Sequence, residues 1–238
     1  MENNNLKLGK TTFYDEGVNV VGTVLMRKVF SWMALALLIT GLTAWIVAGS
    51  EQLLSIIFSS KATFFGLIIG ELVLVVAMTS AINRMSLTTA TLLMVLYSVI
   101  NGATMSSIFL LYTADSIAST FFVTAGTFGV MSLYGYATKR DLSSWGNILF
   151  MGVIGLIIAG VVNMFWGNGT FSLIVSALGV IIFVALTAYD VQKIKVIFNE
   201  ATAVDETTQK IALLGALSLY LDFINIFLYL LRLLGSRK

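Results

Sequence analysis

Two aspartates, Asp190 and Asp222, lie in or directly beside stretches of the sequence that are otherwise apolar. Asp190 follows the apolar run 171–189, and Asp222 interrupts the run 211–233. A carboxylate in hydrocarbon costs at least ~2.5–3.5 kcal/mol on insertion scales, so it normally faces a partner or a wet cavity. Two carboxylates held close together in a low-dielectric site cannot both ionise cheaply, and their protons belong to the pair. Because the chain has no histidine, this pair is the candidate pH sensor.

The last apolar run carries a polar stripe along one helical face. Its members are spaced by 3, 4, 3 and 4 residues: Gly215, Ser218, Asp222, Asn225 and Tyr229. These spacings place them on one side of a helix. Lipid cannot hydrogen-bond such groups, so the stripe must face the protein interior. We therefore take Ser218 and Asn225 as candidate lining residues of a pathway.

Three further residues complete the candidate site. Glu71 and Asn101 fall near the middle of two other apolar runs, and we take both as candidate pathway-lining residues. Arg84 lies just past the end of the run that contains Glu71. As a fixed cation, Arg84 is the candidate partner of a carboxylate at the same depth.

Helix geometry gives the two aspartates different depths. At 1.5 Å per residue, Asp222 lies ~16 Å from the inner start of its run, close to the midplane of a bilayer. Asp190 lies ~28 Å from the outer start of its run, near the inner edge. Contact between them requires the sixth helix to sit further outward than its apolar run, or the site to be an inner vestibule. Arg84 matches the depth of Asp190 better, which predicts an ion pair there.

The elements that position these residues are membrane helices. The chain of 238 residues is 58% hydrophobic and only 11% charged, whereas soluble domains carry ~25% charged residues. Seven apolar runs approach the ~20 residues needed to cross a bilayer. These runs are 29–47, 62–78, 88–111, 117–136, 145–164, 171–189 and 211–233. Their length and continuity predict helices and not barrel strands. We predict an all-α polytopic protein, with a cytoplasmic segment, 1–26, before one seven-helix domain, 27–238.

Glycine pairs mark faces on which neighbouring helices are expected to pack closely. The pairs are Gly66 with Gly70, Gly126 with Gly129, and Gly152 with Gly155. We interpret them as packing faces and not as a pore.

Basic residues indicate the orientation. With the N-terminus inside, ten of the 14 Lys and Arg residues fall on inner segments and four on outer segments. The positive-inside rule therefore favours a cytoplasmic N-terminus, and seven spans then place the C-terminus outside. Because the charge distribution follows the membrane, no nucleic-acid partner is expected.

Composition excludes several enzyme classes. A chain with no His and no Cys cannot be a zinc protease of the HExxH kind or a cysteine enzyme. The remaining enzymatic alternative is an intramembrane aspartyl protease, because Tyr189-Asp190 matches half of its signature. The other half fails, since no glycine precedes Asp222 in the required Gly-x-Gly-Asp pattern and the chain has no proline. We expect no enzyme and no cofactor.

Two segments near the end of the chain resemble one family. The segment 188–195 reads Ala-Tyr-Asp-Val-Gln-Lys-Ile-Lys, and 215–232 reads Gly-Ala-Leu-Ser-Leu-Tyr-Leu-Asp-Phe-Ile-Asn-Ile-Phe-Leu-Tyr-Leu-Leu-Arg. Both are similar to the closing signature of the transmembrane Bax inhibitor motif family, in its bacterial YccA-like branch. The segment 27–35 resembles that family's first helix, so the resemblance covers nearly the whole chain. It implies a seven-helix bundle with the last helix central.

The same resemblance implies a pH-sensitive calcium leak in the plasma (inner) membrane of a bacterium. Two aspartates on the last two helices share a proton in that family, and an arginine on the second helix latches the closed form. These positions match Asp190, Asp222 and Arg84. Carboxylate oxygens suit Ca²⁺, and few ligands would hold it weakly enough for passage. The expected partners are calcium ions, protons and the lipid bilayer.

A second hypothesis belongs to a different class. The protein would be a regulatory membrane protein that binds other membrane proteins, such as a membrane protease, without conducting ions. The aspartates would then serve only to hold the bundle together.

Overall fold

The computed structural model describes residues 2–166 and 168–238, and the side chains of 20–163, 165 and 168–238. The described residues are almost entirely helical, apart from one isolated β-bridge between Tyr112 and Arg237. In chain order the elements are α1 (Glu2–Ala48), α2 (Glu51–Phe58), α3 (Lys61–Ala81), the 3-10 turn η1 (Ile82–Arg84), α4 (Leu87–Met105), α5 (Ser107–Leu111), α6 (Ala114–Ala137), α7 (Trp145–Trp166), α8 (Gly169–Asn199) and α9 (Glu206–Leu234). Seven spans are long and apolar enough to cross a membrane. The predicted all-α, seven-span class is therefore confirmed.

The first and sixth spans extend well beyond the predicted apolar runs. The membrane-length part of α1 begins at Val20, and Leu25 and Val29 are fully buried in the bundle. Residues 20–26, expected in the cytoplasmic segment, thus belong to the first span. α8 continues ten residues past its apolar run, because Ile194 and Phe198 remain buried while Lys193 is exposed to solvent. Long basic side chains can keep their charge in water from such positions.

The third predicted run is divided between two helices. α4 ends at Met105, and α5 begins at Ser107. The buried hydroxyl of Ser106 donates a hydrogen bond to the carbonyl of Ala103, 2.7 Å away. A serine hydroxyl bonded in this way competes with the helix ladder, which accounts for a break that apolarity alone does not reveal.

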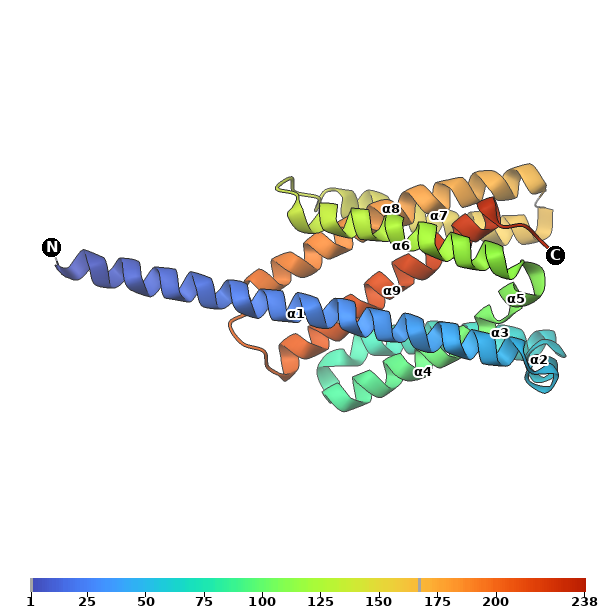
Figure 1. Cartoon of the computed structure of the whole chain (residues 1–238), viewed down its shortest axis with the longest axis horizontal. Helices are drawn as coiled ribbons and strands as arrows, with labels where there is room; N and C mark the ends of the chain where they lie inside the picture. Colours follow the sequence, from blue (N-terminus) through green and yellow to red (C-terminus); the bar gives the residue numbers. More distant parts are fainter. Residues whose placement is uncertain (1, 167) are drawn as a thin grey trace.

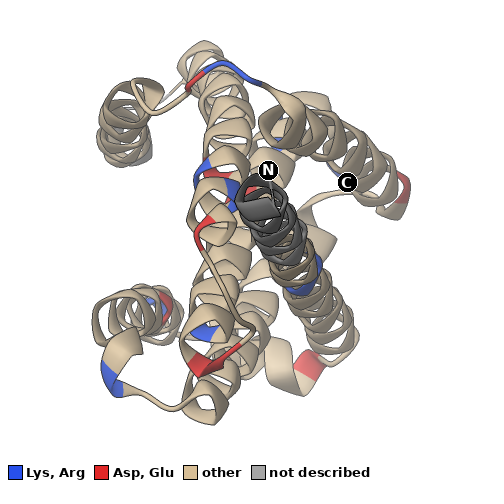
Figure 2. Ribbon diagram, turned by 90° about the vertical axis from the view of Figure 1, so that its left-hand side faces the viewer, with Lys and Arg blue, Asp and Glu red and all other residues tan. Residues whose placement is uncertain are grey.

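α9 is the central helix, as predicted. It packs against α8, α1, α6 and α4, and Figure 1 shows it crossing between α1 and α6. In the most apolar 18-residue stretch of α9, 67% of the residues are buried, whereas the corresponding share is 11% in α3 and 11% in α7. Those two helices are peripheral, and they pack mainly on α4 and on α8. Figure 2, which looks from the N-terminal end, shows few charged residues on the helix walls.

Close helix crossings occur at other glycines than the predicted pairs. A Cβ atom added to Gly102 of α4 would lie 2.6 Å from the carbonyl oxygen of Thr40 on α1, and one added to Gly135 of α6 would overlap the backbone of Ala188 on α8. Among the predicted pairs, only Gly152 has a close neighbour, the side chain of Ile182. The other five would meet nothing within 4 Å: Gly66, Gly70, Gly126, Gly129 and Gly155. The packing prediction was wrong for these five, because their faces lie on the outside of the bundle.

The two ends of α9 are fixed by local contacts. At its start, the Asp205 side chain accepts the backbone N–H of Thr208, a bond that lowers the pKa of Asp205. At its end, the tail 235–238 lies along the α5–α6 connection. Thr113 N–H donates to the carbonyl of Ser236 at 3.1 Å, and further bonds join the tail to this connection.

The α6–α7 loop and the tail 235–238 lie at opposite ends of the bundle (Figure 1), which leads to a topology test. We expect reporter fusions at Arg140, in the α6–α7 loop, and after Lys238 to report opposite sides of the membrane, with Arg140 in the cytoplasm. Paired fusions of alkaline phosphatase and a cytoplasmic fluorescent reporter would measure this. Reports from the same side at both positions would contradict the seven-span topology.

Candidate functional site

Two glycine contacts set the register of α8 against α9. Ile194 of α8 lies over Gly215, and Tyr229 of α9 lies over Gly179. In this antiparallel register Asp222 is level with Thr187, which is three residues, or about 4.5 Å, along α8 from Asp190. The wider separation estimated from the apolar runs was wrong, because both helices continue past the ends of those runs. The polar stripe of α9 faces α8 along its length.

Asp190 lies at a vestibule between α8 and α9 with a volume of about 130 Å³. The vestibule is lined by Asp190, Lys193, Ile194, Ile197, Ile211, Leu214, Gly215 and Ser218. The Ser218 hydroxyl and the Lys193 ammonium both lie close enough to the Asp190 carboxylate to stabilise its charge. Ile197 and Ile211 lie near the loop that joins the two helices, so the vestibule extends toward the N-terminal end of the bundle.

Asp222 is buried beyond the vestibule lining, with 4% of its surface exposed. Its Oδ2 atom has no hydrogen-bond partner within the described part of the chain. The carboxyl is close enough to Asp190 to interact with it electrostatically, although no hydrogen bond between these two described residues joins them. The structure therefore brings the predicted pair into range of each other, one carboxyl at the vestibule and the other enclosed.

Arg84, the predicted partner of Asp190, lies elsewhere. It is an exposed residue of η1, and α3 packs mainly on α4 and not on α8. In the described residues the single ion pair joins Lys210 and Glu206, at 3.0 Å. The predicted ion pair between Arg84 and Asp190 is thus not formed in this structure, because α3 is a peripheral helix. The cation that acts on Asp190 is Lys193, on its own helix.

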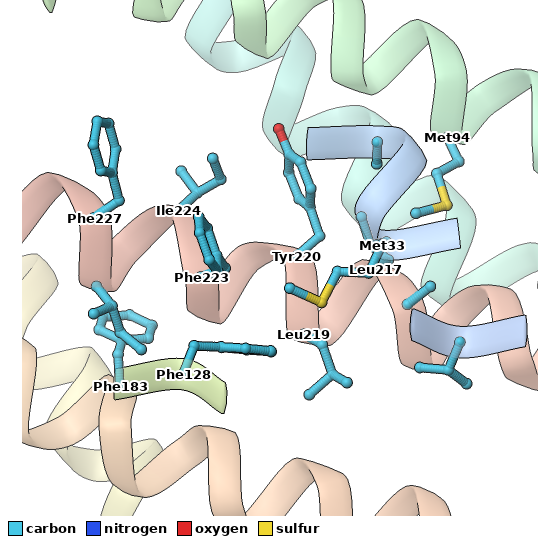
Figure 3. Close-up of a cluster of buried hydrophobic side chains, with 14 of the residues drawn as sticks. Met33, Met94, Phe128, Phe183, Leu217, Leu219, Tyr220, Phe223, Ile224 and Phe227 are labelled. Atoms are coloured by element: carbon cyan, nitrogen blue, oxygen red, sulfur yellow. The ribbon is translucent and has the colours of Figure 1, made fainter. Parts of the chain in front are cut away.

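A second polar cluster lies on another face of α9, and Figure 3 shows its Tyr220 on the opposite side of α9 from Phe183. The Tyr220 hydroxyl donates to Asn101 Oδ1 at 2.9 Å and also bonds to the Thr40 hydroxyl at 2.7 Å. Asn101 Nδ2 in turn donates to Glu71 at 3.0 Å, and Thr104 donates to the other oxygen of Glu71 at 2.6 Å. The cluster joins α1, α3, α4 and α9.

The structure therefore divides the predicted pathway-lining residues. Ser218 lies at the vestibule, whereas Glu71 and Asn101 belong to the second cluster and are absent from the vestibule lining. Asn225 donates to the carbonyl of Leu221 on its own helix, at 2.8 Å.

Sequence reasoning missed Thr40 and Tyr220. Tyr220 lies outside the polar stripe that the sequence analysis identified on the last helix. A tyrosine buried deep in a membrane helix needs a partner for its hydroxyl, and Asn101 in the third run was the polar residue able to supply it. The need of the Tyr220 hydroxyl for a hydrogen-bond partner could therefore have predicted its contact with Asn101. Thr40 gave none, because a single threonine can satisfy its hydroxyl on its own helix.

The second cluster predicts a difference between two tyrosines. Tyr220→Phe removes the donor to Asn101, so we expect a loss of about 1–2 kcal/mol of stability. Tyr97→Phe is the matched control: Tyr97 is also buried, packs edge-on against Tyr220 at 5.7 Å, and has no hydrogen bond from its hydroxyl within the described residues. Thermal unfolding of both variants in detergent would measure the difference, and equal losses would show that the cluster adds no stability.

Comparison with known proteins agrees with this architecture. Residues 22–238 match the family described as "Inhibitor of apoptosis-promoting Bax1". The chain is similar to "Inner membrane protein YbhL" of Escherichia coli (strain K12), with 48% identity over 214 residues, 90% of this chain and 92% of that protein. An uncharacterized protein of Rickettsia prowazekii (strain Madrid E) is 43% identical over 231 residues, 96% of this chain and 94% of its own. An uncharacterized membrane protein of Streptococcus pyogenes serotype M1 is 37% identical over 185 residues, which cover 78% of this chain and 80% of that protein.

The family match spans all seven membrane helices, together with both aspartates and the second cluster. The similarity to YbhL also extends over nearly the full length of both chains. The family resemblance of the segments 188–195 and 215–232 is confirmed. This chain is a member of the Bax inhibitor family of membrane proteins.

Proposed function

We propose that this protein is a pH-sensitive calcium leak channel, with Asp190 and Asp222 as its protonation switch. The observation that carries the proposal is a buried carboxyl about one helical turn from a second carboxyl that lines a vestibule. Two such groups at membrane depth cannot both carry charge cheaply, so proton occupancy of one depends on the other. In a chain without histidine, this pair is the group best suited to respond near neutral pH.

Calcium in this proposal is the permeant ion and not a resident cofactor. The oxygen donors at the vestibule are the Asp190 carboxylate and the Ser218 hydroxyl, with Asp222 behind them. Among the described residues no three acidic, His or Cys side chains gather, so a calcium ion there would keep much of its water. Few hard oxygen ligands make binding weak, as passage of an ion requires.

The geometry gives less support to an aspartyl protease. A peptide bond in the vestibule would meet Asp190, but Asp222 is absent from the lining and is enclosed by protein. Both carboxyls must reach the substrate in that mechanism. We therefore propose a non-enzymatic protein.

One observation favours the second hypothesis, that of a non-conducting regulator. The matched family is described as an inhibitor of another protein, which is a function exerted by binding. Membrane proteins, including a membrane protease, would then be the partners. Ion flux distinguishes the two hypotheses, because a regulator of this kind passes no ions.

The proposed location is the plasma (inner) membrane of a bacterium, with the N-terminus in the cytoplasm. YbhL, at 48% identity, is an inner membrane protein. The excess of basic residues on one side supports the orientation. In that orientation the vestibule faces the cytoplasm.

Calcium flux into liposomes that contain the purified protein tests the proposal. We expect wild-type flux to vary with pH and both Asp222→Asn and Asp190→Asn to lose that variation, because each removes the shared proton. Asp141→Asn is the control, since it removes an exposed carboxylate in the α6–α7 loop. A calcium-sensitive dye inside the liposomes gives the rate. A wild-type pH profile in both aspartate variants would rule out the sensor, and absence of flux in wild-type protein would favour the regulator.

The cation beside Asp190 gives a second test. Lys193→Gln removes the charge that favours ionised Asp190, so protonation should persist to higher pH. We expect the midpoint of the flux profile to rise by about half a pH unit, as for a partly exposed ion pair. Lys195→Gln is the matched control, because Lys195 donates instead to the carbonyl of Tyr136 at 2.7 Å.

The Arg84→Ala variant tests whether the cation that acts on Asp190 is Lys193 or the arginine latch that the family resemblance implies. In the present geometry Arg84 makes no ion pair with a described residue, so this variant should keep the wild-type midpoint. A shifted profile in Arg84→Ala with none in Lys193→Gln would contradict the assignment of Lys193.

A further inference from the structure

An apolar slot with a volume of about 100 Å³ is lined by residues of α1, α4, α5, α6 and α9. Figure 1 shows where α9 crosses between α1 and α6. The floor of the slot includes Phe223, Ile224 and Phe227, which are buried, and Figure 3 shows Ile224 and Phe227 side by side on α9. Gly41 of α1 and Phe121 of α6 belong to its lining and are exposed. The slot is thus walled by hydrocarbon side chains and open at the surface of the bundle.

A wider hollow of about 430 Å³ adjoins the slot at the C-terminal end of the bundle. Phe109 belongs to the lining of both spaces, so they lie next to each other at this residue. The hollow is bounded by the last turn of α1, including Trp45, and by Lys238 of the tail. The Lys238 ammonium donates to the carbonyl of Phe109 at 2.8 Å, which places a positive charge at the junction.

The depth of these features matches the layers of a bilayer leaflet. Trp45 is 65% exposed and lies three residues before the end of α1, a position typical of the membrane–water interface. Gly41 lies seven residues before the end of α1, which places it about 10 Å deeper in the membrane than that end, at the level of the acyl chains. The slot therefore opens toward hydrocarbon, whereas the hollow with Lys238 lies at headgroup level.

Water is a poor occupant of the slot. Its only polar side chain is that of Thr40, whose hydroxyl already bonds to Tyr220 and to the carbonyl of Ser98. A stable buried water needs two to four polar partners. An acyl chain has the matching chemistry, and a phosphate group matches the ammonium in the adjoining hollow.

We propose that the slot and the hollow together bind one phospholipid from the leaflet at the C-terminal end of the bundle. One acyl chain lies in the slot over Phe223 and Phe227, and the phosphate lies beside Lys238. The site is on a different side of α9 from the vestibule, so this inference does not rest on the proposed ion flux.

Gly41 allows the slot to be filled by design. A Cβ atom at Gly41 would meet nothing within 4 Å, so Gly41→Leu places a side chain in the slot without backbone overlap. Gly66→Leu is the matched control: Gly66 also has open space around it, lies in the first turns of α3 at the same end of the bundle, and is absent from the slot.

The experiment uses phosphatidylglycerol that carries a photoreactive diazirine at the end of one acyl chain, in liposomes with the full-length protein. In the wild type we expect labelling of the α9 peptide that contains Phe223 and Phe227. Gly41→Leu should reduce this labelling about tenfold, and Gly66→Leu should leave it unchanged. Thermal unfolding confirms that both variants are folded. Equal labelling of that peptide in both variants would overturn the proposal. Absence of labelling at that peptide in the wild type would overturn it as well, whether or not either variant folds.

The headgroup is tested with diacylglycerol that carries the same photoreactive chain but no phosphate. Phosphatidylglycerol should label the slot several-fold more strongly than diacylglycerol, and Lys238→Gln should remove most of that preference, because it deletes the ammonium. Equal labelling by the two lipids in the wild type would overturn the assignment to a phospholipid. Evidence that a second polypeptide occupies the slot in place of lipid would overturn it as well.

Discussion

The architecture depends on one constraint: polar groups on α9 must be satisfied where lipid offers no hydrogen bond. Asp222 and Tyr220 lie deep in the bundle and are almost fully buried. α8 covers the face with Asp222, while α1 and α4 supply the partners of Tyr220. α9 must therefore be enclosed. α7 can remain at the periphery because it carries no charged residue. α3 can also remain there, because its one carboxylate, Glu71, points toward α4 and accepts a hydrogen bond from Asn101.

The two polar clusters on α9 have different character. Tyr220 and Asp222 are two residues apart, which separates them by about 200° around the helix. In the Tyr220 cluster both oxygens of Glu71 accept a hydrogen bond, and satisfied buried networks of this kind rigidify a structure. Asp222 instead keeps an oxygen without a partner in the described residues. An unsatisfied buried carboxyl calls for an explanation, and the proposed protonation switch supplies one for Asp222, whereas the hydrogen-bonded Tyr220 cluster needs no role beyond a structural one.

Apolar length was enough to predict the class and the number of spans, and the stripe around Asp222 correctly predicted an inward face. The depth of Asp190 was wrong because an apolar run ends at the first charge, whereas α8 continues to Asn199 with one side buried. The Arg84 contact failed for a different reason. Sequence gives depth along the membrane normal but not which helices are neighbours, and α3 lies away from α8. Tyr220 was missed because its ring looks apolar until its hydroxyl is counted.

The contacts at the ends of α9 indicate which helix must move if the separation of the two carboxyls changes. At one end Lys28 of α1 donates to Gln209, at 2.7 Å, and at the other the tail 235–238 is hydrogen-bonded to the α5–α6 connection. Displacement of α9 would break both sets and the Tyr220 cluster. α8 is instead tied to the α6–α7 loop by Gln192, through bonds of 2.7 and 2.8 Å, and to the last turn of α6 before that loop by Lys195, through a bond of 2.7 Å. A sliding of α8 together with that loop against a fixed α9 is a small shear of packed helices, and it changes the vestibule while leaving the anchors of α9 intact.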